Sequence, residues 1–323
     1  MLSSPAKQGA ASSAAIWSAL IAIYIVWGST YLAIRFAVET MPPFLTGGFR
    51  FLIAGGVLYI FRRLRGDKAP LRLEWRSAAI VGLFLLVGGN GGVMWAEQRV
   101  TSGIAALLIA SVPLWIALLD SLRPGSRRPD RWVIVGVLAG FAGILILIGP
   151  AQLIGIEGQV DLVGAVVLLL AALSWAAGSL YNRGAKLPAS PLLGTGMEML
   201  VGSLGLFILG TVTGEWSQME LTSFSTRSLI GFAYLVVFGS WVGFASYVWL
   251  LRVAPTMLVS TYAYVNPLVA ILLGSLLAGE ALTIRIVLAA MIILGSVVLI
   301  TLTNPATSKS ATVENAPVAS GND

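Results

Sequence analysis

Ten apolar stretches of about twenty residues each occupy the chain between positions 16 and 302. A helix of that length, at a rise of about 1.5 Å per residue, matches the roughly 30 Å hydrocarbon core of a bilayer. Inside lipid every backbone donor and acceptor needs an internal partner, and a single helix supplies those partners. The pattern therefore predicts an all-α polytopic membrane protein with ten transmembrane helices.

The composition agrees with this fold class. The chain is 57% hydrophobic and only 11% charged, and its mean hydropathy is +0.90, whereas soluble domains are about 25% charged. We expect the spans at residues 16–34, 44–61, 77–96, 101–119, 132–149, 162–181, 192–213, 228–250, 257–278 and 286–302.

The last five stretches resemble a degenerate copy of the first five. At an offset of 148 residues Trp27 aligns with Trp175, and after a drift to 154 residues Pro113 aligns with Pro267. Five is an odd number, so a second copy of five spans must begin on the opposite side of the membrane from the first. The sequence predicts two inverted five-helix repeats around a central cavity.

The predicted domain organisation follows from these repeats. We expect an N-terminal tail at 1–15, a first repeat at 16–149, a second repeat at 162–302 and a disordered C-terminal tail at 303–323. Fifteen of the 20 Lys and Arg residues fall in the tails and connections of one side, and cytoplasmic loops carry such an excess. Both termini are therefore expected in the cytoplasm.

Charge and missing residue types exclude several kinds of partner. The net charge of +6 arises from loop residues and not from one basic face, so we expect no nucleic acid partner. The chain has no Cys and no His, which removes the best ligands for structural zinc, and we expect neither a metal nor a cofactor. The expected partners are the lipid bilayer and a small-molecule substrate, and the sequence does not set an oligomeric state.

Arg50 is the basic residue that lies inside a span. It lies about seven residues into the second span, roughly 10 Å below the boundary, where an Arg costs up to a few kcal/mol. Such a cost indicates a substrate or gate residue. The alternatives are a side chain that extends to the outer surface and an ion pair with Glu39.

Glu198 occupies the position equivalent to Arg50 in the second repeat and is the acidic residue deepest in a span. Intramembrane acids mark ion and substrate pathways, so Glu198 is a candidate for proton coupling. A static pair with Arg50, or a polar contact between helices, is the alternative.

Helix-weakening residues interrupt both halves at corresponding places. Glycines cluster at 88–92 in the third span and recur at 239–243 in the eighth, and matched interruptions of this kind indicate a transporter's binding site. Glycine also permits close helix packing, which remains an alternative. A proline within the fourth and the ninth span removes a backbone donor. The expected gating hinges are Gly89, Pro113, Gly243 and Pro267.

Deep aromatic and amide side chains complete the candidate site. Small-molecule sites combine apolar walls with a few polar groups, and the alternative for each aromatic residue is a lipid-facing position. The predicted substrate-binding residues are Trp27, Arg50, Asn90, Trp115, Trp175, Glu198, Trp241, Tyr262 and Asn266.

Several short motifs occur in a recognisable order. They are Trp27-Gly28-Ser29-Thr30, Phe49-Arg50-Phe51, Pro113-Leu114, and Val265-Asn266-Pro267-Leu268 followed by Gly279-Glu280. Together they resemble the drug/metabolite transporter superfamily, EamA type, and within it the YedA-like exporters. The resemblance implies a ten-helix inner-membrane carrier with two inverted repeats, often an exporter of amino acids, other metabolites or drugs. It also implies that Glu280 has a structural role.

The expected function is export of a small amphipathic, amino-acid-like molecule by alternating access, with Arg50 attracting an anionic group. A membrane-embedded enzyme or flippase acting on a lipid carrier is one alternative. The sequence argues against an enzyme. It has no His or Cys and a single acidic residue deep in a span, so it offers no paired catalytic groups inside the membrane. A channel is the other alternative, although no ring of charges is visible.

Overall fold

A computed structural model describes residues 12–122, 130–149, 160–254 and 256–303. Residues 1–11 and 304–323 of the two expected tails lie outside the described residues. Ten helical spans in the described chain are long and apolar enough to cross a membrane, which confirms the predicted fold class. They comprise α1 (Ser13–Ala37), α2 (Pro43–Leu64), α3 (Arg72–Gly82) with η1 (Leu83–Gly91) and α4 (Gly92–Ala96), α5 (Ser102–Ile109) with α6 (Val112–Ser121), α7 (Arg131–Ile148), α9 (Leu162–Asn182), α10 (Pro191–Val212), α11 (Thr226–Tyr234) with η4 (Leu235–Val242) and α12 (Gly243–Val253), α13 (Thr256–Ser260) with α14 (Tyr262–Ala278), and α15 (Ile284–Thr303).

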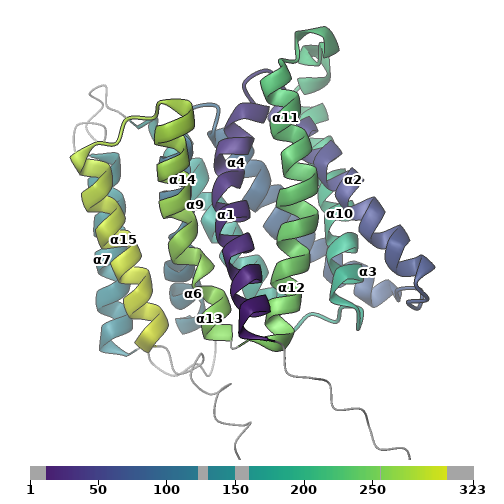
Figure 1. Cartoon of the computed structure of the whole chain (residues 1–323), viewed down its shortest axis with the longest axis horizontal. Coiled ribbons are helices and arrows are strands. Elements are labelled where there is room, and N and C mark those ends of the chain that lie inside the picture. The colour runs from purple at the N-terminus through teal and green to yellow at the C-terminus, as the bar shows by residue number, and fades with distance from the viewer. Residues whose placement is uncertain (1–11, 123–129, 150–159, 255, 304–323) are drawn as a thin grey trace, which may run out of the picture.

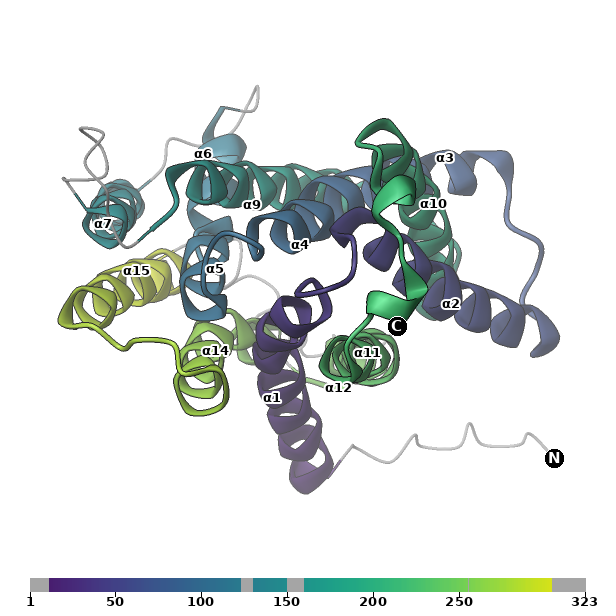
Figure 2. The ribbon, with the colours of Figure 1, turned by 90° about the horizontal axis from the view of Figure 1, so that it is seen from above.

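Equivalent spans of the two halves pack against each other. Near one edge α2 lies along α10, and at the opposite edge α7 lies along α15, with α1, α14, α9 and α5 between them (Figures 1 and 2). Arg35 in the last turn of α1 donates to the Glu97 carbonyl just beyond α4, so α1 and α4 end at the same end of the bundle, which we name the outer end as a label only. Arg99, also just beyond α4, pairs with Asp161 at the start of α9. The first span of each half therefore runs in the opposite direction to the other.

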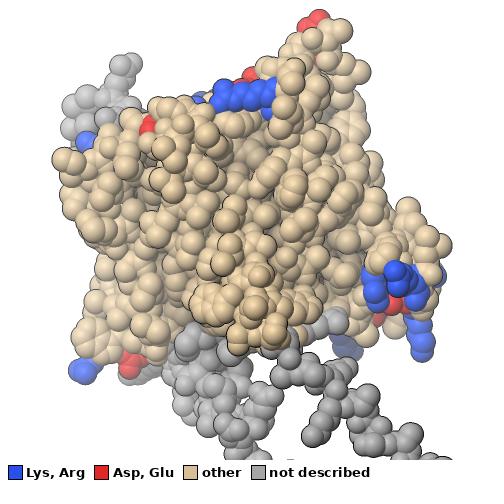
Figure 3. Space-filling view, viewed as in Figure 1, with Lys and Arg blue, Asp and Glu red and all other residues tan. Residues whose placement is uncertain are grey.

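Charged side chains cluster at the two ends of the bundle. On the face drawn in Figure 3, Lys, Arg, Asp and Glu lie at the upper and lower ends, with a band free of charged side chains between them. Large apolar residues such as Leu138 in α7 and Leu276 in α14 are exposed on the spans. This distribution suits a surface whose middle zone meets lipid and whose ends meet water.

The glycine-rich interruptions are wide helical turns and not breaks. Both η1 and η4 are π-helices, so the third and eighth spans deviate from regular α-helix at corresponding places. The Asn90 amide donates to the Leu85 carbonyl (3.3 Å) and the Ser240 hydroxyl to the Leu235 carbonyl (3.1 Å), each five residues earlier. Polar side chains thus donate to a carbonyl in each wide turn, and π-turns of this kind are frequent at functional sites.

The two expected proline hinges differ in the structure. Pro113 is the second residue of α6, where a missing N–H costs nothing, and the span breaks immediately before it. Pro267 instead lies inside the continuous α14, and the break in that span comes earlier, at Thr261. Next to Pro267 the Asn266 amide, in its hydrogen-bonded orientation, donates to the Tyr262 and Tyr24 carbonyls and so joins α14 to α1.

Candidate functional site

Arg50 is buried and lacks an acidic partner among the described residues. Its side chain is 3% exposed, Nε donates to the Ser240 hydroxyl (3.2 Å), and Nη1 contacts no acceptor. Glu39, considered above as its partner, pairs instead with Arg227 at 3.3 Å because both lie at the outer end of the bundle. A buried guanidinium with an unpaired donor has a hydrogen bond left to give, and a negatively charged group is its best acceptor.

Trp27 of α1 approaches the same turn of η4 as Arg50. Its indole N–H donates to the Gly239 carbonyl (3.3 Å), and a Cβ built on Gly239 would lie 3.1 Å from Nη2 of Arg50. The Trp27 ring also makes edge-to-face contacts with Tyr262 (5.1 Å between centroids) and Phe244 (5.5 Å). The structure therefore brings together three of the predicted residues, from α1, α2 and α14, around η4.

A glycine in each interruption contacts a tryptophan ring. A Cβ on Gly243 would lie 2.8 Å from Cδ1 of Trp27, and a Cβ on Gly89 would lie 2.7 Å from Cε3 of Trp175. The two tryptophans align in the two halves at an offset of 148 residues, while the two glycines occupy different positions of the corresponding segments 239–243 and 88–92. Close packing, which the sequence left as the alternative, accounts for both glycines, and their role as hinges stays a prediction.

Of the other predicted residues, Trp241 lies near the residues around η4 and Trp115 lies farther away. Trp241 of η4 donates to the Ala54 carbonyl of α2 (3.2 Å) and packs on the same side as Arg50. Trp115 contacts Phe141 of α7 (5.1 Å between centroids), and α6 and α7 lie across the bundle from α2 (Figure 2). Trp115 therefore lies apart from the residues around η4.

Glu198 of α10 is also separate from Arg50. Its backbone carbonyl packs against Gly82 of α3, and its carboxyl makes no hydrogen bond or ion pair with the described residues. The static pair with Arg50 is therefore wrong for this conformation. The proposed coupling role of Glu198 is not affected.

Two cavities lie at the ends of the bundle, and Arg50 lines neither of them. One, of about 320 Å³, lies at the outer end between the α1–α2 turn and Glu215. The other, of about 690 Å³, lies at the inner end between the start of α3 and the end of α9. Arg50 itself is buried in this conformation, whereas Trp27, Trp241 and Tyr262 are partly exposed.

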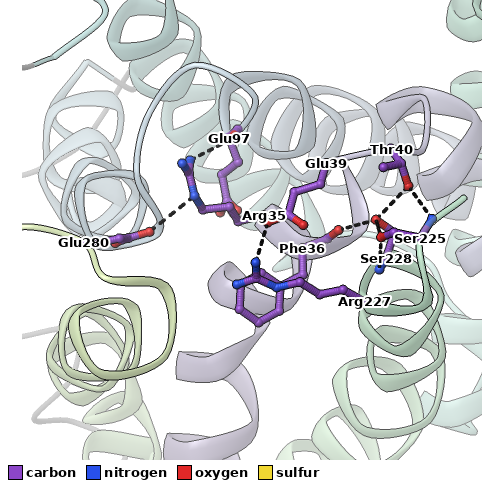
Figure 4. Close-up of polar contacts among 9 residues, drawn as sticks. All are labelled: Arg35, Phe36, Glu39, Thr40, Glu97, Ser225, Arg227, Ser228 and Glu280. Atoms are coloured by element: carbon purple, nitrogen blue, oxygen red, sulfur yellow. Dashed lines mark hydrogen bonds and ion pairs between the residues drawn. The ribbon is translucent and has the colours of Figure 1, made fainter.

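A polar network that sequence reasoning missed joins the outer ends of the two halves (Figure 4). Arg35, in the last turn of α1, donates to the carbonyls of Glu97 (3.2 Å) and Val100 (2.8 Å) and lies 3.6 Å from the Glu280 carboxylate. That carboxylate accepts the Ser102 N–H (2.8 Å) and the Gly103 N–H (3.1 Å) and so caps α5. Separation in sequence concealed these contacts.

Local backbone geometry places Glu280 in this network. Gly279 ends α14 with φ of 65°, a left-handed conformation that favours glycine, and the Glu280 N–H then donates back to the Gly274 carbonyl (3.1 Å). The turn directs the Glu280 carboxylate to the start of α5. The structural role implied for Glu280 thus has a physical basis.

Glu97 is the unusual member of the outer network. It follows α4, is 1% exposed, and neither carboxylate oxygen has a hydrogen-bond partner. Burial raises the pKa of the Glu97 carboxyl well above its usual range, and the nearby negative charge of Glu280 raises it further. The charge of Arg35 opposes this rise in pKa only in part.

The Glu97→Gln variant is expected to flatten the pH dependence of stability. A carboxyl with a raised pKa holds its proton in the folded protein at pH values where the unfolded chain has released it. Stability therefore falls as pH rises from the unfolded pKa of about 4.3 to the raised folded pKa, by up to about 1.4 kcal/mol per pH unit. Melting curves of purified protein between pH 4.5 and pH 8.5 measure this slope. Glu220→Gln, which removes an exposed carboxyl from the same end, is the control, and equal slopes in Glu97→Gln and the unmodified chain would contradict the assignment.

The EamA-like transporter family matches the chain twice, over residues 13–149 and 162–302. The inner membrane transporter YedA of Escherichia coli K12 is 41% identical over 289 residues, which cover 89% of this chain and 90% of that protein. The transporter YoaV of Bacillus subtilis is 23% identical over 282 residues, covering 85% and 92%.

More distant similarities extend over most of the chain. The chloroplastic WAT1-related protein At3g02690 of Arabidopsis thaliana is 28% identical over 270 residues, which cover 82% of this chain and 64% of that protein. A solved crystal structure superposes with a TM-score of 0.60 at 21% identity, covering 91% of this chain and all of the other. At that identity the likeness concerns the fold alone. The double match within one chain agrees with the duplication inferred from paired residues such as Trp27 and Trp175.

Proposed function

Because the chain belongs to the EamA-like transporter family and is a membrane transporter, we propose that it exports a small amphipathic, amino-acid-like molecule across the bacterial inner membrane. The two halves alternately expose one site to either side. Arg50 binds an anionic group of the substrate, and Trp27, Trp241 and Tyr262 form apolar walls beside it. The observation that carries this proposal is the buried Arg50 guanidinium with a free donor and no acidic partner among the described residues.

Saturable counterflow is the expected behaviour in liposomes. A stabilisation screen of purified protein against amino acids, nucleosides, sugars and lipophilic cations first identifies a ligand, since a ligand that binds the native state raises its melting temperature. Vesicles loaded with that ligand are then expected to accumulate labelled ligand from outside. Unitary currents would instead support a channel, and chemical conversion of a supplied lipid carrier would support an enzyme.

The same assay tests proton coupling through Glu198. If Glu198 carries the proton, an imposed pH gradient drives uptake in the unmodified chain, and Glu198→Gln removes that response while counterflow continues. An unchanged response in Glu198→Gln would reject coupling through this residue.

We further propose that both termini face the cytoplasm and that the two halves are inverted repeats. The excess of Lys and Arg in one set of connections supports this orientation, and the opposite directions of α1 and α9 agree with it. The chain has no Cys, so single cysteines give background-free labelling. Lys68→Cys is expected to react only with a probe supplied from the cytoplasmic side and Gln218→Cys only from the opposite side. Labelling of both positions from one side would contradict the inverted arrangement.

A further inference from the structure

The two halves contain equivalent helix junctions at opposite ends of the bundle. The outer junction is formed by the end of α1 and the start of α11, and the inner junction by the end of α9 and the start of α3. Arg35 on α1 corresponds to Arg183 just after α9. Ser228 on α11 corresponds to Ser77 on α3, and an arginine precedes each of these two serines. The pairs allow one junction to be compared with the other, residue by residue.

The outer junction is closed. The Ser228 hydroxyl donates to the Phe36 carbonyl (2.7 Å) and accepts from the Thr40 hydroxyl (2.9 Å), while Arg227 pairs with Glu39 (3.3 Å) (Figure 4). A Cβ on Gly231 would lie 2.8 Å from the Ala33 carbonyl. Helix backbones in contact and a satisfied hydroxyl thus leave little space at this junction.

The inner junction contains the 690 Å³ cavity instead. Ser77 and Gly184 both line it, so the contact equivalent to that between Ser228 and Phe36 is not made. Ser77 is 3% exposed and lines this cavity, and no hydrogen bond among the described residues involves its hydroxyl. A hydroxyl in the wall of a cavity is available to donate to a ligand that enters it.

The charges of this cavity specify the sign of that ligand. Arg183 and Lys186 line it, neither forms an ion pair with a described residue, and no Asp or Glu is among the lining residues. Two cations and a hydroxyl donor in one cavity suit the oxygens of a phosphate group.

The position of the cavity specifies where the phosphate comes from. Leu73 and Tyr181, also in the lining, are 46% and 39% exposed at the membrane end of their helices, so an apolar surface adjoins the cations. Basic pockets between transmembrane helices on the cytoplasmic side bind anionic lipid headgroups. We propose that the cavity between α3 and α9 binds the headgroup phosphate of an anionic phospholipid, with Ser77, Arg183 and Lys186 as its donors. Only the assignment of this site to the cytoplasmic leaflet rests on the orientation proposed for the termini.

Lipid binding to the purified full-length chain tests this site without any transport measurement. Delipidated protein in neutral detergent is titrated with phosphatidylglycerol or phosphatidylcholine, and native mass spectrometry counts the bound lipids. We expect selective binding of phosphatidylglycerol, weakened about 25-fold in Arg183→Gln/Lys186→Gln, since each cation near the membrane surface contributes about fivefold. Ser77→Ala keeps every charge and is expected to weaken binding about fivefold. Ser77→Ala therefore still tests the proposed site if the double variant does not fold.

The matched control is Arg65→Gln/Lys68→Gln, which removes two charges from the same end of the bundle outside the cavity. This variant is expected to bind phosphatidylglycerol as the unmodified chain does. Equal losses in the two double variants would show a general charge effect and overturn the proposal, as would equal binding of the two lipids. Displacement of bound phosphatidylglycerol by millimolar glycerol 3-phosphate would overturn the assignment to a lipid, because a soluble phosphate would then fill the site.

Discussion

Arg50→Gln is expected to reduce transport about a hundredfold and, at the same time, to raise the melting temperature of the protein. The loss of transport follows because an anionic substrate group would no longer meet a charged donor, and a buried charge contact is worth about 2–5 kcal/mol. The gain in stability follows because the guanidinium is buried without an acidic partner among the described residues. An uncompensated buried charge destabilises the folded state, and glutamine removes that charge. Counterflow rates and melting curves of the same preparation measure both effects.

Opposite changes in the two measurements distinguish a binding residue from a structural one. If Arg50 held the fold together, both transport and melting temperature would fall. Arg65→Gln is the matched control, because Arg65 lies at the end of α2 over the Phe61 ring, and it should leave both measurements unchanged. Arg50→Lys keeps the charge but loses the bond from Nε to Ser240, so we expect a smaller loss of transport.

Hydropathy predicted the ten spans because lipid imposes a local rule. Each crossing needs its own run of about twenty apolar residues, and that run is visible without knowledge of its neighbours. The same rule made Arg50 conspicuous, since a charge inside such a run is costly wherever the partners lie. The sequence did not give the neighbours of Arg50. Ser240, which receives its hydrogen bond, lies 190 positions away.

Residues at span ends were harder to interpret. Glu97 follows its span directly, where charges are ordinary, so nothing local distinguished it from a solvated loop residue. The charges that act on its carboxyl are those of Arg35 and Glu280, which come from α1 and from the end of α14. Trp115 illustrates the opposite problem. Lipid and protein core are both apolar, so hydropathy cannot say which of them an aromatic ring faces, and only the structure placed this ring against Phe141.

Gly243→Ala is expected to destabilise the protein by about 1–3 kcal/mol and to slow counterflow about tenfold or more. One methyl group at this position would lie 2.8 Å from Cδ1 of Trp27, and overpacking of a filled interior carries a cost of that size. The ring would have to move away from η4 and would lose its hydrogen bond to the Gly239 carbonyl. Because the same turn of η4 contacts Arg50, we expect the displaced ring to disturb the binding site. Melting curves and counterflow rates of the variant measure the two effects.

Gly295→Ala provides the control, since a Cβ built at Gly295 in α15 meets nothing within 4 Å. Alanine is the better helix former by about 1 kcal/mol, so this variant should be slightly more stable and fully active. In Trp27→Leu the smaller side chain leaves room for the added methyl, so Gly243→Ala should then cost much less than it does beside Trp27. If the two changes instead add independently, Trp27 does not limit the space at Gly243. Gly89→Ala tests the contact with Trp175 in the other half. A similar loss of stability in Gly89→Ala and Gly243→Ala would show that a glycine provides the space for a tryptophan ring in each repeat.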